Sequence, residues 1–99
     1  MKMIYEKIEN ICEELEDALE YAEKYIKCKA RGNLSHANKF KEMSHDELNH
    51  ANMLHELYTA DIEELNKVYT LTEEEEKEWE HCHKHFAEKV AMVRHILSM

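Results

Sequence analysis

The sequence predicts an all-α fold made of three helices. Its 99 residues include one glycine and no proline, so little in the chain would punctuate strands and hairpins. The chain is rich in strong helix formers, and its apolar residues recur at three- and four-residue steps. A chain of this length makes a single small domain, residues 1–99, with a core near the lower limit for independent stability, so self-association is expected.

The first predicted helix covers residues 3–31 and is followed by a tight turn. Gly32 is the natural end of this helix, because glycine adopts a left-handed cap without steric cost. Asn33 or Ser35 is suited to cap the next helix. The apolar stripe of the first helix consists of Ile4, Ile8, Ile11, Leu15, Ala18, Leu19, Ala22 and Ile26.

The second and third helices are predicted at residues 34–68 and 73–98. The second is unusually long for a small domain, and a break near residues 59–60 is compatible with its pattern. Thr72 and Glu75 form a capping box that starts the third helix. Together the first two helices predict a long antiparallel hairpin. The third stripe contains Trp79, Phe86, Val90, Val93 and Leu97.

Charge and cysteine content narrow the function classes. A formal charge of −9 argues against a nucleic-acid partner, because binding to phosphates requires a basic surface. Three cysteines without a Cys-x-x-Cys spacing predict neither a disulfide framework nor a zinc knuckle, which fits a cytoplasmic protein. No apolar run approaches the length of a signal segment or membrane span, so we expect no membrane association.

Two polar residues interrupt the apolar face of the second helix. Glu47 and His50 lie one turn apart and project beside Met43, Ala51 and Leu54. Both side chains are therefore expected to be buried if the helix packs. A buried carboxylate needs a partner, and a metal ion held by Glu-x-x-His supplies one. The alternative is a structural, hydrogen-bonded Glu–His pair in a helical core.

The segment DELNHANMLHEL, residues 46–57, resembles the metal-binding helix of ferritin-like proteins, and specifically that of encapsulated ferritins with short chains. EELEDALEYAEKY, residues 13–25, is similar to the first helix of that group. The likeness spans residues 8–58 and implies a non-haem di-iron centre that oxidises Fe(II), a ferroxidase activity. It implies Glu47 and His50 as ligands, together with Glu14 from the first helix. Glu16, on the opposite side of the stripe, is the alternative.

One chain would supply half of such a centre. A complete ferritin-like centre takes a Glu from each of two helices and a Glu-x-x-His from each of two others. The resemblance therefore implies a homodimer or higher even oligomer, in which two hairpins form a four-helix bundle around the metals. Glu47 would bridge two iron ions, with Glu14 and His50 as terminal ligands, although other divalent metals suit the same donors. Either Tyr21 or Tyr25 is a candidate neighbour of the centre.

The C-terminal VRHILSM does not resemble the cargo-loading peptide of encapsulated ferritins, which argues against enclosure in an encapsulin shell.

Two other interpretations of the sequence stay open. The first alternative is a non-catalytic helical assembly or regulatory module with a structural Glu47–His50 pair. The second is a Zn- or Cu-binding protein that uses His81 and His85, which lie four residues apart on the third helix.

Overall fold

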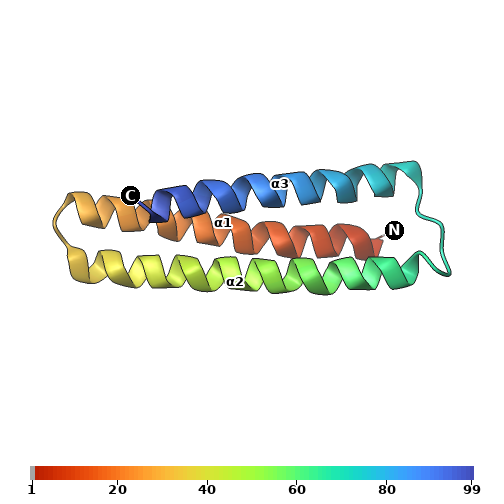
Figure 1. The fold of residues 1–99 in the computed structure, drawn as a ribbon, viewed down its shortest axis with the longest axis horizontal. Helices are drawn as coiled ribbons and strands as arrows, with labels where there is room; N and C mark the ends of the chain where they lie inside the picture. Colours follow the sequence, from red (N-terminus) through yellow and green to blue (C-terminus); the bar gives the residue numbers. More distant parts are fainter. Residues whose placement is uncertain (1) are drawn as a thin grey trace.

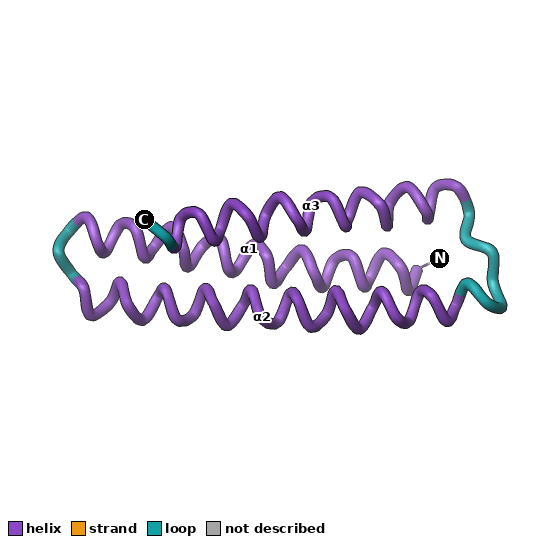
Figure 2. Tube along the Cα trace, in the orientation of Figure 1, coloured by secondary structure: helices purple, strands orange, loops and turns teal. Residues whose placement is uncertain are grey.

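Three long helices make up the chain in a computed structural model that describes residues 2–99. They are α1 (Lys2–Ala30), α2 (Leu34–Leu65) and α3 (Glu73–Leu97), and this part of the chain contains no strand. The helices lie side by side along their length (Figures 1 and 2) in a rod of 55 × 19 × 18 Å. The all-α prediction is confirmed. None of these helices has an apolar stretch long enough to cross a membrane.

The helix ends differ from the predicted ones most clearly in α2. This helix ends at Leu65, so the predicted extension to Val68 is wrong. Residues 66–68 form a turn in which the Tyr69 N–H donates to the Leu65 carbonyl at 2.8 Å. Val68 is 87% exposed, so no core contact favours a longer helix. The break considered near residues 59–60 is absent, and the Thr59 hydroxyl donates to the His55 carbonyl within the continuous helix.

The first turn contains the glycine cap that the sequence predicts. Gly32 has a φ of 76°, in the left-handed region, and the Asn33 N–H donates to the Cys28 carbonyl at 2.9 Å. Of the two proposed caps it is Asn33 that serves, since its side chain accepts the His36 N–H at 3.2 Å. This short connection sends α2 back along α1.

The capping box at the start of α3 is also confirmed. Thr72 accepts the Glu75 N–H at 3.1 Å, and the Glu75 carboxylate accepts the Thr72 N–H at 2.9 Å. The same carboxylate accepts the Tyr69 hydroxyl at 3.1 Å. Glu75 is therefore buried although it belongs to an acidic run, because the cap satisfies it locally.

α1 and α2 pack closely through small side chains. Ser44 is fully buried, and its hydroxyl donates to the Ala18 carbonyl at 2.7 Å. Nearer the other end, Asn10 donates to the Tyr58 hydroxyl at 3.1 Å, so the two helices run in opposite directions. Because Ala51 is also buried here, no large side chain holds the backbones apart. This close approach fixes which residues of α1 face each residue of α2.

α3 packs mainly on α1 and meets α2 only through large side chains. The backbones of α2 and α3 stay further apart than those of α1 and α2. Rings from both helices fill the space between them: His55 of α2 stacks on Phe86 of α3, with ring centroids 4.3 Å apart. The bundle therefore has a tight α1–α2 side and an aromatic α2–α3 side.

Candidate metal centre

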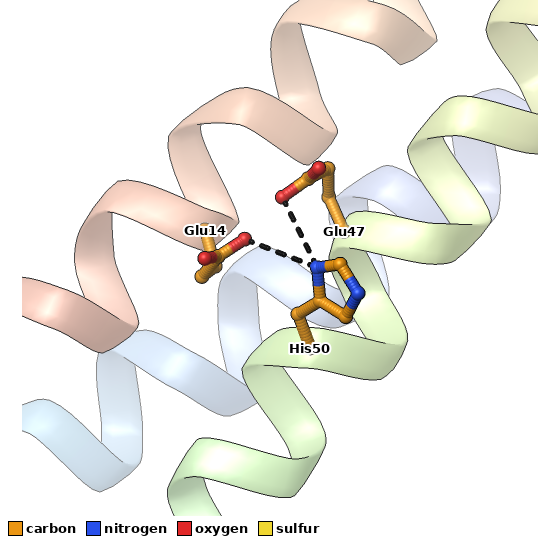
Figure 3. A group of neighbouring side chains, drawn as sticks. All are labelled: Glu14, Glu47 and His50. Carbon is orange, nitrogen blue, oxygen red and sulfur yellow. Dashed lines mark ion pairs between the residues drawn. The ribbon is translucent and has the colours of Figure 1, made fainter.

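Glu14, Glu47 and His50 converge on one point between α1 and α2 (Figure 3). Each offers one ligand atom, and these atoms all lie within 4.8 Å of one another. Nδ1 of His50 lies 3.6 Å from Oε2 of Glu14 and 3.7 Å from Oε2 of Glu47. The three residues that the sequence singled out are thus neighbours in space.

Helix geometry explains the convergence. Glu47 and His50 are three residues apart on α2 and so lie on one face, one turn apart. Glu14 comes from α1 and faces them because the nearby Ser44–Ala18 contact sets the alignment of the two helices. Glu16, the alternative ligand, is exposed elsewhere on α1, where its charge acts on the Cys12 thiol.

Burial differs across the group. The side chains of Glu14 and Glu47 are 29% and 22% exposed, whereas that of His50 is 54% exposed. The expectation that Glu47 and His50 are both buried is therefore wrong for His50 in a single chain. The physical reason is the position of α3, which covers the other side of α1 and α2 and leaves this face open (Figure 3).

The two carboxylates share a single imidazole, that of His50, as their ion-pair partner in this group. Oε2 of Glu14 is buried and has no hydrogen-bond partner. The pKa of Glu47 is raised, mainly by a hydrogen bond with the Glu14 carboxyl and then by desolvation and the charge of Glu14. The nearby His50 lowers this pKa and so opposes part of the increase. A cation bound here would stabilise the two neighbouring carboxylates of Glu14 and Glu47. The set of carboxylate and imidazole donors suits Fe(II) and other divalent metals.

Apolar side chains surround the group on the open face. A hollow of about 220 Å³ beside it is lined by Glu14, His50, Met53 and Leu54. Met53 is 67% exposed and Leu57 is 55% exposed. A single stripe at alternating steps of four and three residues, the spacing of a coiled-coil seam, runs along α2 here. It consists of Met43, Glu47, His50, Leu54 and Leu57.

The two candidate tyrosines lie nearer the first turn. Tyr21 stacks on Phe40, which precedes Glu47 by two turns, with ring centroids 6.3 Å apart. Tyr25 is buried in the core and its hydroxyl contacts Lys29. Neither belongs to the group of three that offers ligand atoms to a common point.

Comparison of the chain with protein families, curated proteins and solved structures found no match. The likeness to ferritin-like proteins therefore depends on the two quoted segments, residues 13–25 and 46–57. Glu14 lies in the first segment, and Glu47 and His50 lie in the second.

The histidines proposed as a Zn or Cu site lie beside cysteines. His81 and His85 line a hollow of about 170 Å³ between α1 and α3, together with Cys12 and Cys82. Cys82 is buried, and burial raises the pKa of its thiol to about 11. Within residues 2–99, no three of these ligand atoms lie within 4.8 Å of one another. Their geometry is thus less suited to metal than that of the Glu14 group.

Sequence reasoning did not single out His55. Its Nε2 lies 2.6 Å from Nδ1 of His83, across the α2–α3 interface. The available signal was its spacing: His55 follows buried Ala51 by four residues and precedes buried Ile62 by seven. These steps place an imidazole on the inner face of α2.

Proposed function

We propose that two copies of this chain assemble a di-iron carboxylate centre and oxidise Fe(II) with dioxygen. The observation that carries the proposal is the convergence of Glu14, Glu47 and His50, two acids and an imidazole from two helices, at one point. The buried Oε2 of Glu14 supports a cation there, because it has no hydrogen-bond partner and its nearest printed contact is the His50 imidazole at 3.6 Å.

A second copy completes the site. One chain provides a single Glu and a single Glu-x-x-His, and a two-fold axis would double this to the four glutamates and two histidines of a ferritin-like four-helix bundle. The open face of α1 and α2 is the surface for this contact. Its exposed Met53 and Leu57 would become buried, and the half-exposed His50 would become enclosed.

Each residue has a distinct role in the proposal. Glu47, which lies between the two helices beside His50, would be shared by the metals, and Glu14 and His50 would each hold one of them. Iron held by these residues would supply the electrons for dioxygen reduction, and the carboxylates would stabilise the ferric product. The formal charge of −9 attracts Fe²⁺ to the protein.

A reducing compartment fits this chemistry. Cys12, Cys28 and Cys82 are all free thiols in the fold. Such a compartment keeps both thiols and Fe²⁺ reduced, so we propose the cytoplasm as the site of action.

Iron oxidation by single-residue variants tests the assignment. Fe²⁺ is added without oxygen, air is admitted, and ferric absorbance is followed with time. The rate should fall to the background in Glu14→Ala, Glu47→Ala and His50→Ala. It should be unchanged in the exposed controls Glu13→Ala and His45→Ala. Wild-type rates in folded Glu47→Ala and His50→Ala would overturn the proposal.

A further inference from the structure

A second pair of potential metal ligands lies between α2 and α3. Nε2 of His55 and Nδ1 of His83 face each other at 2.6 Å, from two different helices. Both residues are half-buried. The ring of Phe86 stacks on His55 at 4.3 Å with an interplanar angle of 5°, and the Trp79 ring lies edge-on to His83 at 4.7 Å. The aromatic neighbours hold the two imidazoles in place.

The protonation state of this pair favours metal binding. At 2.6 Å the two nitrogens share one hydrogen, which one ring donates and the other accepts. Burial, and then the nearby His83, lower the pKa of His55, against a smaller opposing effect of Glu56. A neutral imidazole is the form that coordinates transition metals.

An acidic hollow leads to the pair. It has a volume of about 350 Å³, lies between the ends of α2 and α3, and reaches His83. Three carboxylates line it, from Glu63, Glu76 and Glu80. Glu80 precedes His83 by one helical turn, the same spacing that joins Glu47 to His50. The lining attracts cations and places an exposed carboxylate within one turn of the imidazoles.

We propose that His55 and His83 form a second metal site, which binds a transition-metal ion such as Cu²⁺ in place of the hydrogen between the rings. The ring that donated this hydrogen carries it on its other nitrogen, so both facing lone pairs become ligands. Within residues 2–99 no carboxylate oxygen lies within 4.8 Å of both nitrogens, so the two imidazoles are the protein ligands and water completes the coordination. The site lies on the α3 side of α2, away from Glu14, Glu47 and His50, and does not depend on their function.

Trp79 reports on this site directly. It is the only tryptophan of the chain, and its ring contacts His83. Cu²⁺ bound to the pair should quench its fluorescence with a stoichiometry of one ion per chain. Quenching should persist in His50→Ala and in the double variant His81→Ala/His85→Ala, because neither change touches the pair.

Variants of the pair decide the proposal. His55→Phe keeps a flat ring against Phe86 and should abolish stoichiometric quenching, whereas the exposed control His45→Phe should not. Glu80→Gln removes one of the negative charges that line the hollow, and should weaken Cu²⁺ binding by a smaller factor than His55→Phe does. Circular dichroism establishes that each variant is folded. Quenching that survives in folded His55→Phe, or is absent from the wild-type chain, would overturn the site, and neither result bears on iron oxidation.

Discussion

Oε2 of Glu14 lies 3.6 Å from Nδ1 of His50, although the two residues belong to different helices. No hydrogen-bond donor reaches that oxygen. The contact exists because small residues let α1 and α2 approach, with Ser44 bonded to the Ala18 backbone beside it. Helix packing therefore brings the three residues together and leaves one buried oxygen, Oε2 of Glu14, without a hydrogen bond.

Replacing Glu47 should stabilise the metal-free protein while removing its response to metal. Its raised pKa means that the folded chain binds a proton more tightly than the unfolded chain, so stability falls as pH rises above the ordinary value of 4.5. Glu47→Gln removes the repulsion between the Glu47 and Glu14 carboxylates, and should increase the free energy of unfolding by up to about 1 kcal/mol at pH 7. Urea denaturation without metal measures the change.

The response to metal is tested with a matched control, Glu42→Gln, which replaces an exposed acid on the same helix. In anaerobic Mn²⁺, the wild-type protein and Glu42→Gln should gain thermal stability, because the ion binds only the folded state. Glu47→Gln should gain none. A metal-induced shift in Glu47→Gln equal to that of the wild type would contradict the role of this carboxylate.

A charge on the open face should prevent self-association. Leu57→Glu places a carboxylate, and its symmetry copy, in the proposed dimer interface. Like charges there cost several kcal/mol, so the dimer dissociation constant should rise about 100-fold or more. Sedimentation measures this constant. Met92→Glu, at an exposed methionine of α3, should leave it unchanged. Equal dissociation of the two variants would exclude this face.

Acid should weaken the α2–α3 contact through His55. Because the pKa of His55 is lowered below its ordinary value of 6.5, its contribution to stability is complete above pH 6.5 and is lost as pH falls. Protonation of His55 also places a positive charge in a half-buried site against the His83 imidazole, 2.6 Å away. The melting temperature of the metal-free protein should therefore fall between pH 7 and pH 5.

His55→Phe carries no titrating ring and should flatten that acid dependence. His45→Ala should keep it, since His45 is exposed elsewhere on α2. Thermal melts of both variants at the two pH values give the comparison. An unchanged slope in His55→Phe would show that other groups cause the acid response.

Any side chain at position 32, in the first turn, should lower the free energy of unfolding. Gly32 has a φ of 76°, and an added Cβ would meet nothing within 4 Å, so the penalty of Gly32→Ala is purely conformational. We expect a loss of about 1 kcal/mol in unfolding free energy. Gly32→Asn should lose less, because asparagine enters the left-handed region more readily. Equal losses in a denaturation series would contradict this explanation.

Local patterns were sufficient to predict the helices and their caps. Gly32 and the Thr72–Glu75 box are signals contained within a few residues, and both have the predicted role. The sequence predicts that α2 extends to Val68, because this residue fits the apolar period. The helix ends at Leu65, because Val68 is exposed and gains no core contact. The apolar period predicts which face of a helix is buried, but it does not predict where the packing against a neighbouring helix ends.

Tertiary relationships set the limits of the prediction. Spacing alone places Glu47 beside His50, whereas the choice between Glu14 and Glu16 depends on which side α3 covers. The same covering leaves His50 exposed in one chain. The His55–His83 contact joins residues 28 apart in the sequence, so no local pattern reveals it.

A crystal structure of the iron-loaded protein, with anomalous diffraction recorded at the iron edge, tests the central claim most directly. We predict anomalous peaks between two symmetry-related chains, each within coordination distance of Glu14, Glu47 and His50. Peaks located only at other residues, or an iron-loaded chain whose open face contacts no second copy, would contradict it.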